Sequence, residues 1–211
     1  MRAIPSRPIE SLEPDPRREG AVRIVIGGRT VLIVPLGAVE REGLAVGSSL
    51  GAGQVERLLI ASDHEAAFRT AVRLLERRPF ARRDLARRLG MKGHPPAAVD
   101  AALDRAAQAG YLDDERFARH FVQSRNARGR GPLRLRRELA LHGVDPDLAE
   151  RVLTEEIPAE ASSDQMVALA RKRARQLGEL PRRDRIRRLL AFLARRGYKG
   201  PAAIKVVREV A

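Results

Sequence analysis

Hydrophobic residues recur along the chain with two different periods. Two runs rich in valine and isoleucine, at 22–26 and 29–34, flank Gly27-Gly28. A Gly-Gly pair suits a two-residue turn because both turn positions need positive φ, so this segment is predicted to form a β-hairpin. From Ser62 onward the apolar residues are spaced three or four apart, which indicates amphipathic helices. The chain is therefore predicted to be mainly all-α, with a short N-terminal β-hairpin extension.

The helical part contains an internal repeat. The pattern Leu-x3-Leu-x3-Gly occurs three times, ending at Gly93, Gly143 and Gly197. In each copy the two leucines lie on one helical face, and the glycine suits the C-cap that ends the helix. Each copy follows one amphipathic helix and precedes another that begins near a proline. We therefore predict three tandem three-helix bundles that stack into an elongated and curved body.

The segments outside the repeat complete the predicted organisation. Four prolines and little hydrophobic pattern in the first 20 residues predict a flexible arm. Ser62 with Glu65, and Ser162 with Gln165, have the spacing of capping boxes and predict helix starts. The predicted parts are a flexible arm over 1–20, a hairpin with a short helix over 21–61, and three-helix units over 62–110, 111–157 and 158–211.

Charge narrows the choice of partner. The 211 residues include 41 basic and 27 acidic side chains, a net charge of +14. Such an excess favours a nucleic acid, or an acidic protein surface that carries nucleic acid. The stretch from Arg116 to Arg137 has eight arginines and no acid. Solvated helices usually alternate charge signs, so this run favours binding, although a plain solvated surface stays open as the alternative.

The arginines fall on predictable helix faces. With Leu135 and Leu139 turned inward, the nearby arginines lie on the outer face, and the same holds around Leu189 and Leu193. If the units stack in register, these side chains form one basic stripe that clamps an anionic partner, strongest in the second and third units. The candidate binding residues are Arg116, Arg119, Arg125, Arg128, Arg130, Arg134, Arg136, Arg137, Arg171, Lys172, Arg175, Arg185, Arg187, Arg188, Arg195 and Arg196.

The few aromatic residues limit the kind of DNA contact. Phe68, Phe117, Phe121 and Phe192 fall at inward positions, and Tyr111 and Tyr198 adjoin helix junctions. We expect them to be core residues and not platforms for stacked bases. Contacts to single-stranded or duplex DNA are therefore predicted to be sequence-nonspecific phosphate contacts through arginine.

Signatures of catalysis and of metal binding are missing from the sequence. It has no glycine-rich phosphate loop and no cysteine, and its four histidines are scattered without ligand spacing. Asp113-Asp114-Glu115 is better explained by N-capping of a helix than by a metal cluster. We expect no enzyme activity, no metal and no cofactor. The absence of cysteine fits a reducing cytoplasm, and we expect neither a membrane span nor a signal peptide.

Several motifs together resemble the RecX family. They are the run from Gly110 to Ala118, Gly129-Arg130-Gly131-Pro132 leading into Arg137-Glu138-Leu139, and Leu193-Ala194-Arg195-Arg196-Gly197-Tyr198. The resemblance covers about Ser62 to Val210, and the hairpin is similar to an extension of some members. One departure is Phe80-Ala81-Arg82, where members often have a serine. The missing side-chain cap predicts fraying of the helix that follows, at a typical cost of ~1 kcal/mol.

The resemblance implies tandem three-helix repeats and a regulatory role without catalysis. It implies binding in the groove of the RecA–single-stranded DNA filament, with inhibition of RecA's ATP hydrolysis, strand exchange and co-protease activity, and hence negative modulation of recombination and the SOS response. We expect the chain to act as a monomer. The alternative is a stand-alone DNA-binding protein, either a helix-turn-helix-like regulator or a nucleoid protein. Gln123 and Asn126 are the only base-reading candidates near the basic run.

Overall fold

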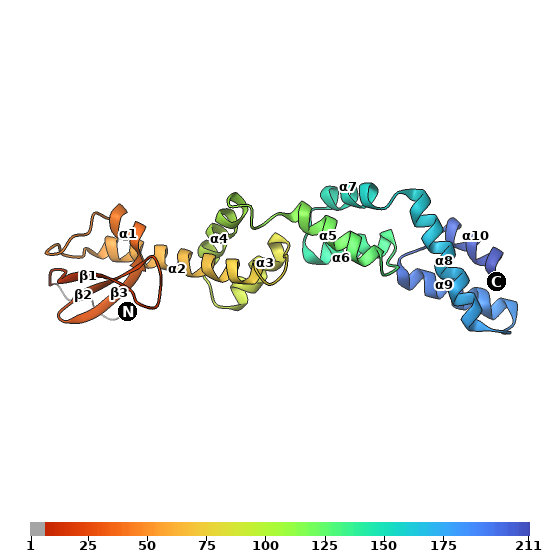
Figure 1. Cartoon of the computed structure of the whole chain (residues 1–211), viewed down its shortest axis with the longest axis horizontal. Helices are drawn as coiled ribbons and strands as arrows, with labels where there is room; N and C mark the ends of the chain where they lie inside the picture. The colour runs from red at the N-terminus through yellow and green to blue at the C-terminus, as the bar shows by residue number, and fades with distance from the viewer. Residues whose placement is uncertain (1–6) are drawn as a thin grey trace. The chain divides into compact units, whose positions relative to one another are not determined.

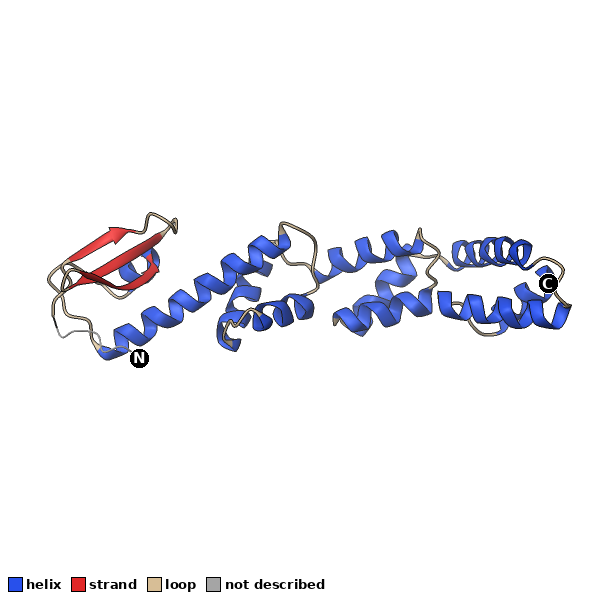
Figure 2. Ribbon diagram, turned by 90° about the horizontal axis from the view of Figure 1, so that it is seen from below, coloured by secondary structure: helices blue, strands red, loops and turns tan. Residues whose placement is uncertain are grey.

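A computed structural model describes residues 7–211. A three-stranded antiparallel sheet with the order β1-β2-β3 stands at the N-terminal end, and helices make up the rest (Figures 1 and 2). The strands are β1 (Ser11–Pro14), β2 (Ala21–Ile26) and β3 (Arg29–Pro35). Gly27 and Gly28, with φ of 61° and 70°, form the turn between β2 and β3, so the predicted hairpin is confirmed.

The flexible-arm prediction is wrong for the part of 1–20 that pairs with this hairpin. β1 adds a third strand along β2, with Ser11 opposite Val25 and Pro14 opposite Val22. Ile9 is buried against the sheet, and the Glu10 carboxylate accepts hydrogen bonds from the N–H groups of the Gly-Gly turn at 2.8 and 2.7 Å. An isolated hairpin is marginal in water, and the extra strand removes one of its open edges. Residues 1–6 of the predicted arm lie outside the described residues.

The helices follow the predicted order. They are α1 (Leu36–Arg41), α2 (Ala52–Leu75), α3 (Arg82–Met91), α4 (Pro96–Gln108), α5 (Asp114–Asn126), α6 (Pro132–His142), α7 (Pro146–Glu156), α8 (Ala159–Leu177), α9 (Arg182–Arg196) and α10 (Pro201–Val210). Over the described part of the chain, none of them has the length and apolar character needed to cross a bilayer.

The three-helix modules are confirmed. They comprise α2–α4, α5–α7 and α8–α10, and the repeat leucines of α3, α6 and α9 are fully buried. Gly143 and Gly197 end α6 and α9 in the left-handed conformation, as the repeat predicts. Asp145 caps α7 by accepting hydrogen bonds from the N–H groups of Asp147 and Leu148, with Pro146 at the first helical position.

The chain forms two compact units, which are described separately. Of the described residues, the first contains 7–78 and 85–111, hence the sheet, α1, α2, most of α3, and α4. The second contains 79–84 and 112–211, so the second and third modules belong to one unit. Its two apolar clusters surround Leu135 and Leu139 in one module and Leu189 and Leu193 in the other.

Neither predicted capping box starts a helix. Ser62 lies in the middle of α2, where its hydroxyl donates to the carbonyl oxygens of Leu58 at 2.9 Å and Ile33 at 3.3 Å. The boundary predicted between 61 and 62 therefore falls inside a continuous helix. Ser162 likewise lies within α8, which begins after Pro158. α2 begins earlier because the turns before Ser62 also bury apolar side chains. α8 begins earlier because it starts directly after Pro158.

The start of α3 is capped from a distant residue, which corrects the expected loss of a cap. Asp114 Oδ1 accepts a hydrogen bond of 2.7 Å from the backbone N–H of Arg82. Burial raises the pKa of Asp114, and the hydrogen bond from Arg82 partly opposes this shift. Asp84 is buried, and its Oδ2 lies 2.5 Å from Nδ1 of His142. The sequence analysis did not predict this contact.

Candidate anion-binding interface

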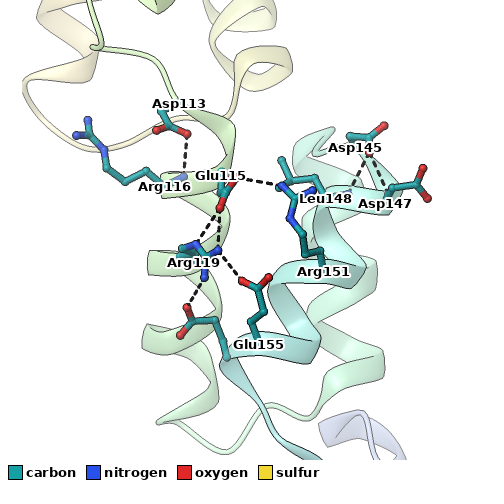
Figure 3. Close-up of polar contacts among 10 residues, drawn as sticks. Asp113, Glu115, Arg116, Arg119, Asp145, Asp147, Leu148, Arg151 and Glu155 are labelled. Atoms are coloured by element: carbon teal, nitrogen blue, oxygen red, sulfur yellow. Dashed lines mark hydrogen bonds and ion pairs between the residues drawn. The ribbon is translucent and has the colours of Figure 1, made fainter.

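The first half of the arginine-rich stretch lies on α5, and its central arginine faces α7 (Figure 3). The Arg119 guanidinium donates hydrogen bonds to Glu115 at 2.7 Å, Glu155 at 2.5 Å and Glu156 at 3.0 Å. Glu115 also accepts a hydrogen bond of 3.0 Å from Arg151 of α7. Arg119 is therefore neutralised within its own module.

These contacts stabilise the charged forms of the groups that make them. Hydrogen bonds from Arg119 and then Arg151 hold the pKa of Glu115 below its usual value. The hydrogen bond to Glu115 is the main cause of the raised pKa of Arg119. Hydrogen bonds from Gln123 and Arg119 lower the pKa of Glu156. Each of these three shifts favours the charged form of its group.

The second half of the stretch lies around α6 and also meets carboxylates. Glu138 accepts hydrogen bonds from Arg130 at 2.5 Å and from Arg134 at 2.9 Å. Arg136 donates two hydrogen bonds, of 2.7 and 2.8 Å, to Glu150 of α7. Burial raises the pKa of Glu138, but the hydrogen bonds from Arg134 and Arg130 outweigh it, and the net shift is downward.

Arginine side chains also link the second module to the third. Arg134 Nη1 donates to the carbonyl oxygen of Arg195 at 3.0 Å, and Arg196 Nη1 donates to that of Arg128 at 2.8 Å. The backbone also takes part in this contact between modules, since the N–H of Gly131 donates a hydrogen bond of 2.7 Å to the carbonyl oxygen of Arg196. These side chains fasten the second module to the third.

The remaining arginines of α5 and the third module differ in their contacts. The guanidinium carbon of Arg125 lies 5.3 Å from the centroid of the Phe121 ring, a cation–π contact. Arg187 donates to Asp184 at 2.9 Å, and Arg185 donates to the carbonyl oxygen of Ala211. These three therefore also have partners within the chain.

Half of the candidate residues remain exposed and have no carboxylate partner within the part of the chain that the structure describes. They are Arg116, Arg128, Arg137, Arg171, Lys172, Arg175, Arg188 and Arg195. The other eight candidates contact partners within the chain, so half of the predicted basic stripe is engaged internally. The acid-free run is acid-free in sequence only, because carboxylates of α7 and Glu138 reach back to it in space.

Two of the exposed arginines meet in a groove of about 800 Å³ between α6 and the end of α9. Arg137 lines it from α6, and Arg195 and Lys199 line it from the other side. Leu133, Arg137 and Leu141 follow at four-residue steps along α6, and the two leucines are 44% and 72% exposed. The groove thus combines cations with apolar side chains, which suits an acidic and partly apolar protein surface.

Sequence reasoning missed the apolar part and the lysine of this groove. A signal was present, since Leu133 and Leu141 are offset from the core leucines of α6 and cannot share their face.

Gln123 was a candidate for reading DNA bases. In the structure, its side-chain amide donates a hydrogen bond of 2.8 Å to Glu156. That side chain is engaged within the chain and is poorly placed to read DNA bases.

The fold defines a class of protein, a mainly helical protein built from tandem three-helix modules. Among the described residues there is no group of three or more His, Asp or Glu side chains that could hold a metal ion. Two family models match the chain: the first three-helix domain of RecX over residues 67–105, and the second over residues 113–153. The chain belongs to the RecX family of regulatory proteins.

Curated relatives named "Regulatory protein RecX" support this assignment. The protein of Halorhodospira halophila is 39% identical over 137 residues, which cover 64% of this chain and 81% of the relative. That of Thermobifida fusca is 38% identical over 140 residues, 65% of this chain and 75% of the relative. That of Mycobacterium avium is 39% identical over 148 residues, 69% of this chain and 85% of the relative.

Solved structures share the fold. A crystal structure titled as that of regulatory protein RecX superposes with a TM-score of 0.82 at 20% identity, covering 96% of this chain and 99% of that one. The structure of RecX from Lactobacillus salivarius gives a TM-score of 0.64 at 17% identity, covering 71% of this chain and 97% of that one.

Proposed function

We propose that this chain is a negative regulator of the RecA recombinase. It binds the RecA–single-stranded DNA filament and thereby inhibits ATP hydrolysis, strand exchange and co-protease activity. Membership of the RecX family supports this proposal. The observation that carries the proposed mode of contact is the groove between α6 and α9, with its exposed cations and leucines.

The proposed mechanism is occupation of the filament, with no chemical step. The groove contacts an acidic, partly apolar surface of RecA, while exposed cations of α8 such as Arg171 and Arg175 contact DNA phosphates. Each contact is weak by itself. Because they belong to one compact unit, however, the second contact forms at a high effective concentration once the first is made.

The main test is RecA's DNA-dependent ATPase with a double reversal, Arg137→Glu with Arg195→Glu. We expect the concentration needed for half-inhibition to rise about tenfold or more, equivalent to ~1.4 kcal/mol of binding free energy. Arg208→Glu is the matched control, since it reverses an exposed arginine of α10 outside the groove. Unchanged inhibition by the double variant, with an unchanged helical circular dichroism signal, would remove the groove from the mechanism.

The same assay separates two modes of action. Inhibition at far fewer than one chain per RecA protomer indicates capping of filament ends. A requirement for about one chain per binding site along the filament indicates coating of the groove. A stand-alone DNA-binding regulator, by contrast, would bind duplex DNA with a preferred site and leave the ATPase unaffected.

A further inference from the structure

The first compact unit contains a second basic cleft, of about 930 Å³, that the interface described above does not include. It is lined by Arg17 and Arg18 from the β1–β2 connection, by Arg69 and Arg73 from α2, and by Arg105 and Tyr111 from α4 and the turn that follows it. Among the described residues, no aspartate or glutamate lines this cleft. It therefore concentrates positive charge in the first module, where the sequence predicts the weakest basic surface.

The arginines of this cleft are only partly neutralised. Glu65, outside the lining, pairs with Arg105 at 2.7 Å and lies 3.8 Å from Arg69. Arg17, Arg18 and Arg73 have no carboxylate partner in the part of the chain that the structure describes. Arg73 makes only a 3.4 Å hydrogen bond to the hydroxyl of Thr70, which also lines the cleft. At least three guanidinium groups are thus available to an anion.

The cleft also presents flat side chains. Tyr111 is 53% exposed, the one aromatic among the large exposed apolar side chains of the described residues. Its position is fixed by Gly110, whose φ of 72° turns the chain, and by the hydrogen bond from the Tyr111 N–H to the carbonyl oxygen of Ala106. In the same lining, the Arg105 guanidinium lies 3.8 Å from the centroid of the Phe68 ring. The expectation that Tyr111 is a core residue is therefore wrong.

We propose that this cleft binds a nucleotide unit, with its base stacked on Tyr111 and its phosphates held by Arg17, Arg18 and Arg73. An exposed ring beside unpaired guanidinium groups is the combination by which proteins bind unpaired bases and their backbone without reading sequence. The volume is within the range of sites for small ligands, which leaves room for about one nucleotide. The unit comes from a single strand or from a free nucleotide.

The test uses the full chain without RecA, so its outcome is independent of the proposed inhibition. Binding of fluorescent oligothymidine is measured in the Arg171→Glu, Arg175→Glu background, which weakens the phosphate contacts proposed for α8. Tyr111→Ala is expected to weaken binding about 5- to 150-fold, the usual effect of losing one stacked base, and Tyr111→Phe to retain it. Arg17→Ala with Arg18→Ala should lower the slope of log K against log salt by ~0.7 for each lost phosphate contact. Arg29→Ala, an exposed arginine of the hairpin outside the cleft, is the matched control.

Photocrosslinking locates the contact directly. An oligothymidine carrying one 5-iodouracil is expected to crosslink to the tryptic peptide 106–116, which contains Tyr111. Competition by dTTP identifies the free nucleotide as the ligand, and competition by a longer oligonucleotide alone identifies a strand; both retain the site. The proposal is overturned if Tyr111→Ala binds like the parent chain and crosslinks map elsewhere. An oligoglutamate peptide that binds as tightly as oligothymidine, regardless of Tyr111, also overturns it.

Discussion

The α5–α7 contact and the α6–α9 groove use the same arginine-rich stretch in opposite ways. In the α5–α7 contact, Arg119 meets three carboxylates, two of them from the last turn of α7. In the groove, Arg137 shares the lining with Arg195 and Lys199, and among the described residues the one acid of that lining is Glu138, which is already paired twice. The difference lies in which helix is the neighbour: α7 supplies acids, whereas the end of α9 supplies cations. Charge patterning within one helix therefore does not decide whether an arginine is available to a partner.

The largest expected effect concerns the junction that fastens the second module to the third. A Cβ added at Gly197, where φ is +97°, would lie 2.5 Å from Cβ of Arg134 and 2.6 Å from its backbone nitrogen. Gly197→Ala is therefore expected to lower the free energy of unfolding by ~3 kcal/mol, through backbone strain and steric overlap together. Urea denaturation followed by circular dichroism measures this loss.

Gly93→Ala is the control for that change. Gly93 also has a positive φ, +85°, but a Cβ there meets no atom within 4 Å. Only the backbone strain of ~1–2 kcal/mol should remain. Equal losses in the two variants would mean that the close approach of α6 and α9 does not contribute to stability.

A smaller effect is expected at Glu138, the acid that binds two arginines next to the groove. Glu138→Gln should lower the free energy of unfolding at pH 7 by ~1–2 kcal/mol, because it weakens two charge-assisted hydrogen bonds. The exposed pair of Arg136 and Glu150 supplies the control, since Glu150→Gln should cost less than ~0.5 kcal/mol.

The effect of Glu138→Gln on the free energy of unfolding should depend on pH, because the pKa of Glu138 is lowered in the folded state. A carboxyl group whose pKa is lower in the folded state stabilises the fold above its unfolded pKa, near 4.5. That contribution is lost as pH falls through the folded value. The parent chain and Glu138→Gln should therefore differ at pH 7, begin to converge as pH falls below the unfolded pKa near 4.5, and converge fully below the lowered folded pKa. A constant difference across this range would contradict the ionic role of Glu138.

The smallest effect is expected on α5. Arg119→Ala should destabilise the chain slightly, and the loss should shrink when salt is added, because the network is exposed and screened. Arg116→Ala, a change at an exposed arginine without a carboxylate partner among the described residues, should leave stability unchanged. Thermal unfolding at low and high salt compares the two variants. A salt-independent loss in Arg119→Ala would point to packing and not to charge.

The repeat was predictable from sequence because its signals are local. Leucines four residues apart and a glycine at the C-cap specify a buried helix face and its end, and Leu135, Leu139 and Gly143 take these roles. The state of the arginines was not predictable, because their acids lie far along the chain. Arg119 binds Glu155, 36 residues away, and the start of α3 is capped by Asp114, 32 residues from Arg82.

Contacts between residues far apart in the sequence also explain the errors at the N-terminal end. Polar and proline-rich residues around Ser11–Pro14 carry little strand signal, and they form β1 because β2 offers a free edge. The cleft of the first unit could not be predicted from the sequence for a related reason. It draws arginines from three segments, none of which contains an extended basic run, and only the fold brings them to one place.

The uninterrupted course of α2 has a mechanical consequence. Its first half carries Leu58 into the core of the sheet, and its second half carries Ala67 and Ala71, fully buried, through the first three-helix module. A helix of 24 residues is a stiff rod of ~36 Å. The sheet and this module should therefore tumble as a single body in NMR relaxation, and a force applied to the sheet should reach the module without a hinge to absorb it.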